Sequence, residues 1–351
     1  MESGTVEQTL PGLGAPDLPS PGPVMGRTIG LSPTKRLMLV SGRSNPDLAR
    51  EIADQIGCEL GETTLKSFPS GETYCRYEDS IRGADIFIVQ TASMPVDQHL
   101  MELLIMIDAA KLASAKRITA VIPWYFYVRQ DKKSRPREPI TAKLVADLLQ
   151  TAGADRVLTM DLHAGQVQGF FEIPVDHMTA IPLFAQYVRD LNITEELAVV
   201  SPDTGHAKIA GKFAEMVEGD LVILNKVRPE HSKAKVTAVI GDVEGKVAVI
   251  IDDIIDTAGT LVAGAQALKE AGATKVYACA THGLFNEKAL ERIAGSEIHK
   301  LVVTDTVPLD PLRRPDNIQV LSIAGILAET ISNVFADDSV SAIFAGENQL
   351  F

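Results

Sequence analysis

The sequence predicts an α/β fold made of two similar domains, each built on a doubly wound parallel sheet. The main observation is the repeated order of strand, helix and strand along the 351 residues. The predicted strands are short apolar runs, which is typical of strands buried on both faces of a parallel sheet. They lie at residues 36–41, 85–90, 117–123, 157–160 and 198–201. Helix-forming segments at residues 46–56 and 99–112 separate the first of them.

A faint internal repeat is the second observation. Residues 82–90, a helix and residues 115–123 are matched later by residues 244–252, a helix and residues 273–281. Two unrelated strand–helix–strand units would give a similar pattern, but two similar α/β domains explain it more economically.

The repeat and the composition divide the chain. Residues 1–33 are rich in Pro, Gly and Ser without hydrophobic periodicity, so we predict a disordered tail. The tail lacks the apolar core of a signal peptide, and its acidic residues disfavour a transit peptide. We predict a first α/β domain at residues 34–181 and a second at residues 182–335, with residues 336–351 joining the first.

The composition excludes several classes of protein. Hydrophobic residues make up 46% of the chain and charged residues 23%, as in soluble globular proteins. No apolar run approaches the roughly 18–20 residues of a membrane span. Cys58, Cys75 and Cys279 have no CxxC spacing, which argues against a disulfide framework or a zinc site. We therefore expect a cytoplasmic protein that does not bind a membrane.

The formal net charge of −13 is a further constraint. A nucleic-acid-binding protein would be expected to have a basic surface, so we expect no nucleic-acid partner. The same charge repels anionic substrates, so any phosphate binding must come from local basic clusters and backbone N–H groups.

Residues 247–260 are the stretch around which the rest is organised. An apolar run ends in Asp252 and Asp253, and a short loop then leads into a helix-forming segment. We expect the two carboxylates at the carboxyl end of a buried strand, where ligands bind in open α/β sheets. Backbone N–H groups of residues 257–260 would form an anion site at the helix N-terminus. A phosphorylated sugar fits both features, whereas the alternative is an ordinary strand–turn–helix with two solvated acids.

Two further apolar strands bring polar side chains to the same edge. Residues 157–164 contain Asp161 and His163, and residues 199–205 contain Asp203. Together with the carboxylate pair, this set suits Mg²⁺, which is usually held by few protein ligands, water and substrate phosphates. Imidazole is an unusual Mg²⁺ ligand, so we expect His163 to contact mainly nucleotide phosphate or bound water. A histidine satisfied within the core is the alternative.

A basic stretch follows another predicted strand. Residues 129–137 contain five cations, namely Arg129, Lys132, Lys133, Arg135 and Arg137. In an acidic chain this cluster indicates a polyphosphate site, although a solvated charged loop would have the same composition. The aromatic residues at 124–127 are expected mostly to pack in the core rather than to stack on a base.

Lys226 and Arg228 lie at the end of another apolar run, before a polar segment. Two cations at such a junction could close over a transferring phosphoryl group. Cations that only decorate an edge strand would give the same pattern.

Together these stretches resemble the ribose-phosphate diphosphokinases (phosphoribosyl-pyrophosphate synthetases) of the phosphate-regulated bacterial class. That family has the type I phosphoribosyltransferase fold. The resemblance covers about residues 36–345. Its motifs are MELLIMID at 101–108, PITAK at 139–143, DLHA at 161–164, QGFF at 168–171, GDV at 241–243 and the stretch at 252–260. A base-transferring phosphoribosyltransferase shares only the last of these.

The resemblance implies a reaction in which the β,γ-diphosphate of ATP passes to the anomeric hydroxyl of ribose 5-phosphate. The products are 5-phosphoribosyl 1-diphosphate and AMP. It further implies a Mg²⁺ cofactor and a homo-oligomer, a hexamer built from dimers.

It also implies roles for individual residues. Arg129 and Gln130 would bind ATP, with Ser70, Gly71 and Glu72 reaching the adenine site from a neighbouring subunit. His163 and Asp203 would attend the metal. Lys226 and Arg228 would be catalytic, stabilising the transferring diphosphate. The residues implied for ribose 5-phosphate are Asp252, Asp253, Asp256, Thr257, Ala258, Gly259 and Thr260.

The chain departs from the family pattern at three places. Ser70 stands where Asp or Asn is common, and Phe126 replaces a usual glycine. After Asp203, residues 205–209 replace the usual Gly-Gly and following arginines. Two alternative functions therefore stay open: a base-transferring phosphoribosyltransferase, and an inactive homologue that regulates active subunits.

Overall fold

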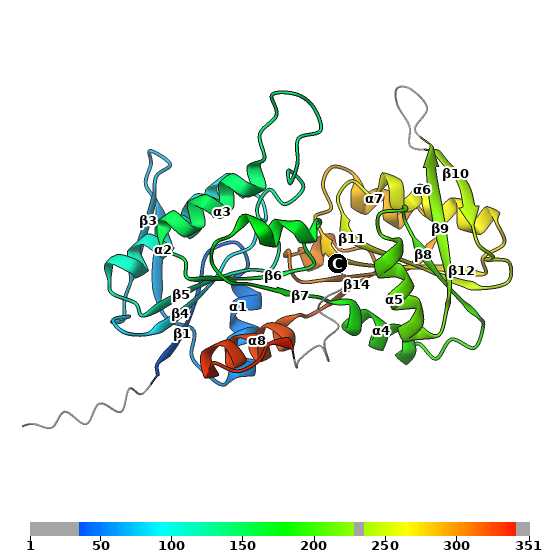
Figure 1. Cartoon of the computed structure of the whole chain (residues 1–351). Helices are drawn as coiled ribbons and strands as arrows, with labels where there is room; N and C mark the ends of the chain where they lie inside the picture. Colours follow the sequence, from blue (N-terminus) through cyan, green and yellow to red (C-terminus); the bar gives the residue numbers. More distant parts are fainter. Residues whose placement is uncertain (1–34, 228–234, 342–351) are drawn as a thin grey trace, which may run out of the picture. The chain divides into compact units, whose positions relative to one another are not determined.

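The computed structural model describes residues 35–227 and 235–341, apart from the side chains of residues 226–227 and 235–237 (Figure 1). The predicted tail at residues 1–33 lies outside the described residues, as do Arg228 and residues 342–351. Among the described residues, none of the helices is long and apolar enough to cross a membrane.

A five-stranded parallel sheet forms from the first half of the chain (Figure 1). In spatial order its strands are β1 (Leu37–Ser41), β4 (Asp85–Val89), β5 (Arg117–Ile122), β6 (Arg156–Met160) and β7 (Val175–Met178). Helices cover both faces: α1 (Pro46–Ile56), α4 (Ile181–Asp190) and α8 (Ala324–Ala336) on one, and α2 (Val96–Leu112) and α3 (Thr141–Ala152) on the other. The strands follow one another across this sheet in a single direction.

The second sheet has seven strands, and its order reverses. In spatial order they are β10 (Lys235–Ile240), β9 (Asp220–Val227), β8 (Leu197–Ser201), β11 (Val247–Ile255), β12 (Lys275–Gly283), β13 (Ile298–Thr304) and β14 (Ile318–Leu321). One face packs against α5 (Ala207–Val217), and the other against α6 (Gly259–Glu270) and α7 (Ala289–Ala294). The chain leaves β8 toward β9 and returns to β11 on the other side. A topological switch point therefore lies between β8 and β11.

The predicted α/β fold with two parallel sheets is confirmed, and several strands were not foreseen, among them β13 and β14 of the second sheet. β2 (Thr63–Ser67) and β3 (Thr73–Tyr77) pair as a separate two-stranded antiparallel sheet. β10 pairs antiparallel with β9, as a single edge strand on an otherwise parallel sheet. β7 is a short strand in a stretch that the sequence pattern left unassigned. The short 3₁₀ helices η1 (Gly165–Phe170) and η2 (Pro311–Arg313) complete the described elements.

Local sequence explains where the elements begin and end, as α1 shows. The side chain of Asn45 accepts a hydrogen bond from the backbone N–H of Leu48, and Pro46 occupies the first helical position. Gly57 ends the helix with φ +78°, a left-handed conformation that glycine adopts without strain. The predicted end of this helix at Ile56 therefore matches the observed one.

One apolar core is shared by the two sheets. It joins buried residues of the first sheet, such as Phe87 and Leu158, to Val249 and Tyr277 of the second. α8 packs against α1, so the chain returns to the first sheet after completing the second. The domain boundary between residues 181 and 182 stays a prediction.

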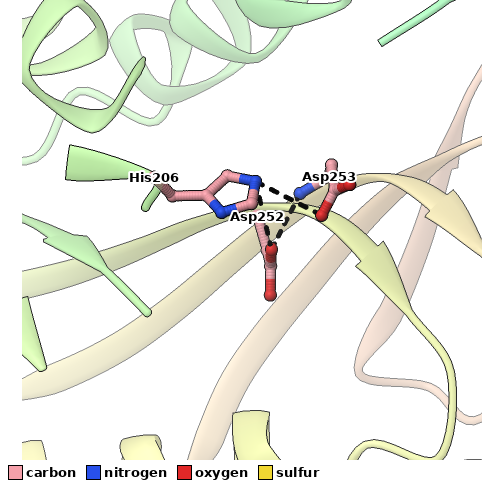
Figure 2. Close-up of side chains that lie close together, drawn as sticks. All are labelled: His206, Asp252 and Asp253. Atoms are coloured by element: carbon pink, nitrogen blue, oxygen red, sulfur yellow. Dashed lines mark hydrogen bonds and ion pairs between the residues drawn. The ribbon is translucent and has the colours of Figure 1, made fainter. Parts of the chain in front are cut away.

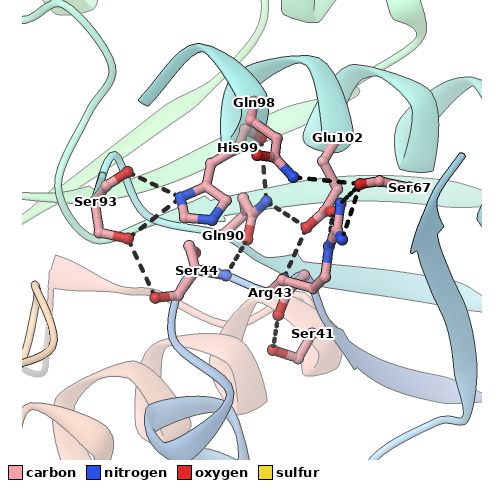
Figure 3. Close-up of polar contacts among 10 residues, drawn as sticks. Ser41, Arg43, Ser44, Ser67, Gln90, Ser93, Gln98, His99 and Glu102 are labelled. Carbon is pink, nitrogen blue, oxygen red and sulfur yellow. Dashed lines mark hydrogen bonds and ion pairs between the residues drawn. The ribbon is translucent and has the colours of Figure 1, made fainter. Parts of the chain in front are cut away.

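A buried polar network ties α2 to the β2–β3 hairpin (Figure 3). Glu102, on α2, is fully buried and accepts hydrogen bonds from the Arg43 backbone N–H at 2.7 Å and from Gln90 at 2.9 Å. The Arg43 guanidinium also pairs with this carboxylate and reaches Ser67 Oγ at the end of β2. Arg43 is therefore the main charge partner of a buried acid and one of the contacts that hold the hairpin.

Replacing Arg43 with alanine is expected to lower the free energy of unfolding by about 1–3 kcal/mol, since it leaves a buried carboxylate without its charged donor. Urea denaturation would measure the change. Arg50→Ala is the matched control, because the Arg50–Asp47 pair on α1 is largely exposed, and its loss should change stability by less than about 0.5 kcal/mol. Equal effects of the two substitutions would contradict the assignment.

Candidate active site

The turn after β6 is fixed by contacts to the end of β7 and to β12. Asp161 is buried with φ +29°, and its carboxylate accepts hydrogen bonds from the Ala180 backbone N–H at 2.8 Å and from Thr281 Oγ1 at 2.6 Å. His282 Nε2 lies 3.1 Å from the Asp161 carbonyl oxygen. Burial raises the pKa of Asp161. Asp161 thus positions the backbone that presents His163.

His177, on β7, supports the same turn. Its Nε2 accepts a hydrogen bond from the Leu162 backbone N–H at 2.8 Å. Burial lowers the pKa of His177 to about 3, so the ring is neutral in the folded protein at ordinary pH.

This gives a pH-dependent prediction. Below about pH 6.5 the unfolded chain takes up a proton at His177 that the folded chain does not bind. The contribution of neutral His177 to the free energy of unfolding is therefore complete above that pH and is lost as the pH falls. The excess stability of the wild type over His177→Gln should therefore shrink by up to about 1.4 kcal/mol per pH unit between pH 6 and pH 4. Urea denaturation of both proteins over this range would measure it. A constant difference would show that His177 is protonated in the folded state.

The carboxylate pair lies on β11, but not at its end. The sequence pattern predicted that the strand stops at Ile251, whereas β11 runs to Ile255. Its pairing with β8 ends at Ile250, while its pairing with β12 continues to Ile255. Asp252 and Asp253 therefore lie just beyond the last pair with β8, at the switch point, where strand pairing on one side has already ceased. The expected position at a ligand-binding edge is right in effect, but the strand end was predicted four residues too early.

Two histidines flank this pair. His163 Nδ1 lies 2.6 Å from Asp253 Oδ2, and His206 Nε2 lies 3.3 Å from Asp253 Oδ1 and 3.8 Å from Asp252 Oδ1 (Figure 2). Asp253 is buried, and its Oδ1 makes no hydrogen bond within the described part of the chain. This oxygen instead has His206 as its ion-pair partner.

The charges in this cluster shift one another. Burial opposes protonation of His206, but the carboxylates of Asp203, Asp253 and Asp252 outweigh it and raise its pKa to about 10. The hydrogen bond to Asp253 raises the pKa of His163. Burial and the charge of Asp253 raise the pKa of Asp252. Burial also works against ionisation of Asp253, but its two histidine partners lower its pKa, so it is the carboxylate that stays ionised.

Asp203 lies in the turn between β8 and α5. Its Oδ1 accepts hydrogen bonds from the backbone N–H groups of Gly205 at 2.9 Å and His206 at 3.2 Å, and lies 3.7 Å from His206 Nδ1. This side chain therefore shapes the turn that carries His206 over β11.

The loop at residues 256–260 connects β11 to α6. Asp256 accepts a hydrogen bond from Asn286 Nδ2 at 2.7 Å and pairs with the Arg129 guanidinium. Ala258 precedes α6 with φ +60°, a left-handed conformation that is uncommon outside glycine. The expected loop at the N-terminus of a helix is confirmed, with Thr257, Gly259 and Thr260 beside Ala258.

A cavity of about 640 Å³ brings the carboxylate pair and the two histidines together with part of the basic stretch, whereas Asp203 and residues 256–260 line neither this cavity nor the next one. Its lining includes Arg129, Lys132, His163, His206, Asp252 and Asp253. A second cavity of about 1230 Å³ is lined by Arg129 and Gln130, with Tyr127 and Phe285. Arg129 lies between the two and contacts both.

The aromatic residues before the basic stretch are mostly core residues, as predicted. Trp124, Tyr125 and Phe126 are buried. Phe126 therefore fills space in the core next to the basic stretch rather than facing a ligand.

Some predicted site residues are not brought to these cavities. Ser70, Gly71 and Glu72 lie in the loop between β2 and β3, where Ser70 donates a hydrogen bond to Glu72, and they line neither cavity. The backbone of Lys226 belongs to β9, but its side chain lies outside the described residues, as does all of Arg228. The functions predicted for these residues stay predictions.

His206 is the residue that sequence reasoning missed. Residues 205–209 stood out only as a departure from the family pattern. A histidine three residues after an acid at the end of a strand was the available signal, but its approach to β11 depends on the switch point between two strands.

Comparisons with known proteins agree with this geometry. Residues 37–153 match the N-terminal domain of ribose phosphate pyrophosphokinase, and residues 199–345 match the phosphoribosyl synthetase-associated domain. The chain is 51% identical over 311 residues to a ribose-phosphate pyrophosphokinase of Staphylococcus saprophyticus, a match that covers 88% of this chain and 97% of that protein. A relative of the same name from Staphylococcus aureus is 51% identical over 310 residues, again covering 88% and 97% of the two chains.

A solved structure shows the same fold. The crystal structure of phosphoribosylpyrophosphate synthetase from Mycobacterium smegmatis superposes with a TM-score of 0.82 at 45% identity, covering 86% of this chain and 100% of that one. The chain belongs to the ribose-phosphate pyrophosphokinase family.

Proposed function

We propose that this protein transfers the β,γ-diphosphate of ATP to ribose 5-phosphate. The anomeric hydroxyl oxygen forms a bond to the β-phosphorus, the bond between that phosphorus and the α,β-bridging oxygen breaks, and AMP leaves with that oxygen. The products are AMP and 5-phosphoribosyl 1-diphosphate. The observation that supports this best is the convergence of Asp252, Asp253 and His163 with Arg129 and Lys132 on one cavity.

The carboxylates and the loop after them would bind the sugar phosphate. Asp252 and Asp253 would accept hydrogen bonds from ribose hydroxyls, and the stretch Asp256, Thr257, Ala258, Gly259 and Thr260 would hold the 5-phosphate at the start of α6. Arg129 pairs with Asp256. Binding of the sugar phosphate and of ATP would then exchange this contact for contacts to substrate.

Arg129 and Gln130 would bind ATP, and Ser70, Gly71 and Glu72 would complete the adenine site from a neighbouring copy of the chain. The exposure of the β2–β3 loop, where Phe68 is 45% exposed, supports a function between subunits. A homo-oligomer, a hexamer by family resemblance, is therefore part of the proposal, as is a cytoplasmic location.

The site residues fit a divalent cation. Carboxylate oxygens are the ligands that Mg²⁺ prefers, and Asp253 Oδ1 is a buried oxygen that makes no hydrogen bond among the described residues, although His206 Nε2 lies 3.3 Å from it. His163 and Asp203 would hold Mg²⁺ together with water and phosphate oxygens. The ion would neutralise charge on the triphosphate of ATP.

The chain's own contribution is mainly positioning and charge stabilisation. Lys226 and Arg228 would stabilise the charge that builds on the transferring diphosphate. Arg129 would fix the ATP phosphates against the sugar site.

The two alternatives are less well supported. A base-transferring phosphoribosyltransferase would leave the cations of residues 129–137 without a purpose. An inactive homologue would be expected to have lost metal-site or sugar-site residues, yet His163, Asp203, Asp252 and Asp253 are present and lie close together.

The test is AMP release by the purified full-length protein with ATP, Mg²⁺ and ribose 5-phosphate. AMP and 5-phosphoribosyl 1-diphosphate are expected in equal amounts. A nucleoside monophosphate and diphosphate that form only when a free base and 5-phosphoribosyl 1-diphosphate are supplied would favour the base-transferring alternative. No product under either condition, from a folded protein, would favour the regulatory one.

A further inference from the structure

We propose that His177 and His282 are positioning residues of the reaction. Together they clamp the peptide group between Asp161 and Leu162, and through that group they fix His163 in the site. The inference rests on the proposed function, because it concerns how the proposed reaction is organised. Neither His177 nor His282 lines either cavity, so both act through other residues rather than by touching a substrate.

Both hydrogen-bonding groups of this one peptide unit are held by a histidine ring. His282, on β12, has its Nε2 3.1 Å from the Asp161 carbonyl oxygen, and His177, on β7, has its Nε2 2.8 Å from the Leu162 backbone nitrogen. A carbonyl oxygen only accepts and a backbone N–H only donates, so His282 Nε2 carries a proton and His177 Nε2 does not. The two rings are therefore opposite tautomers that hold the two ends of one peptide group.

Burial keeps both rings neutral, as this arrangement needs. It lowers the pKa of His177 to about 3 and that of His282 to about 4. A neutral imidazole has one donor and one acceptor, so the acceptor of His282 is Nδ1. This atom lies 2.9 Å from Thr306 Oγ1 and accepts a hydrogen bond from that hydroxyl, which fixes the tautomer.

The clamped peptide group follows a residue with an unusual backbone conformation. Asp161 has φ +29°, outside the regions that a residue other than glycine adopts freely, and such a residue persists where its surroundings determine it. Two residues later, His163 Nδ1 lies 2.6 Å from Asp253 Oδ2. Rotation of the peptide group after Asp161 would carry His163 away from Asp253, and the donor on His282 opposes that rotation.

His282 also links this turn to the ATP-binding stretch. Its ring lies against Trp124, with ring centroids 4.4 Å apart. The Trp124 backbone N–H donates to Thr91 Oγ1 at 3.0 Å, and Thr91 Oγ1 donates to the Thr306 carbonyl oxygen at 2.8 Å. The same His282–Thr306 pair therefore holds both the turn that carries His163 and the first residue of the stretch that carries Arg129.

The experiment is steady-state AMP formation by full-length variants of His282. His282→Leu fills the buried space without a donor, and we expect kcat to fall about 10–100-fold with both KM values within about threefold of the wild type, because small misplacements of reacting groups are costly. His282→Gln keeps an amide N–H that reaches the Asp161 carbonyl, so its kcat should exceed that of His282→Leu at least about fivefold. His282→Asn has the same amide on a shorter side chain and should not recover.

Thr330→Val is the matched control. Thr330 is equally buried, on α8, and donates a hydrogen bond to the Ile326 carbonyl oxygen at 2.8 Å, outside both cavities. Its loss should lower the unfolding temperature without changing kcat. Should His282→Leu not fold, as judged by circular dichroism, the comparison of His282→Gln with His282→Asn carries the test.

Three results would overturn the inference alone: wild-type kcat in His282→Leu, a kcat of His282→Gln no higher than those of the leucine and asparagine variants, or raised KM values with unchanged kcat. The second of these would show that His282 only fills space. Absence of AMP release by the wild type would overturn the proposed function, and this inference with it.

Discussion

Replacing Asp252 and Asp253 together with asparagine is expected to weaken ribose 5-phosphate binding by roughly 10²–10⁴-fold while changing ATP binding much less. Each carboxylate would accept a charge-assisted hydrogen bond from a ribose hydroxyl, and its loss costs on the order of 1.5–3 kcal/mol. The two side chains are neighbours and share His206, so the two losses need not add. Isothermal titration with each substrate would measure the effect.

The control is a pair of exposed acids outside both cavities. Asp54→Asn with Asp316→Asn removes the same formal charge, and neither residue lines a described cavity. This variant should bind both substrates like the wild type. Equal weakening for ribose 5-phosphate and ATP in the Asp252/Asp253 variant would instead indicate a shared metal role or a folding defect, and thermal unfolding would distinguish these two.

Local patterns predicted the elements that carry the site. The buried runs before Asp161, Asp203 and Asp252 identified β6, β8 and β11 as parallel strands. These features are encoded within a few residues of one another. For the same reason, the side chains at the ends of the strands could be assigned to one edge before the sheet order was known.

Features that depend on a neighbouring strand could not be predicted in this way. β11 extends to Ile255 because β12 continues to pair with it, and nothing within residues 247–255 indicates the length of β12. The β2–β3 hairpin was missed because its residues are half exposed and short of the apolar alternation that marks a strand.

The same limit explains His206. Its distance to Asp253 depends on the turn after β8 lying over β11, which follows from the reversal of strand order between them. A single sequence shows that His206 follows Asp203, but not that β8 and β11 are adjacent.

Lys226→Ala is expected to lower kcat by about 10²–10³-fold while changing both KM values only modestly. β9 runs parallel to β8, and its last pair with β8 joins Ile223 to Ser201, so the backbone of Lys226 lies beyond that pair at the edge that holds Asp203. An ammonium group delivered to this edge would act mainly on the charge that builds on the transferring diphosphate. Losing one preorganised electrostatic contact of this kind commonly costs about that factor in turnover.

Loss of a contact that is made only in the transition state lowers kcat and kcat/KM by the same factor. Steady-state measurements of AMP formation by Lys226→Ala would therefore show whether Lys226 acts in this way. Lys226→Arg should restore little activity, because a planar guanidinium is a poor replacement for a compact point charge. Lys275→Ala is the matched control, since this exposed lysine begins β12 at the opposite edge of the same sheet. Near-wild-type kcat in Lys226→Ala would remove Lys226 from the mechanism, whereas a raised KM with unchanged kcat would assign it to ground-state binding of substrate.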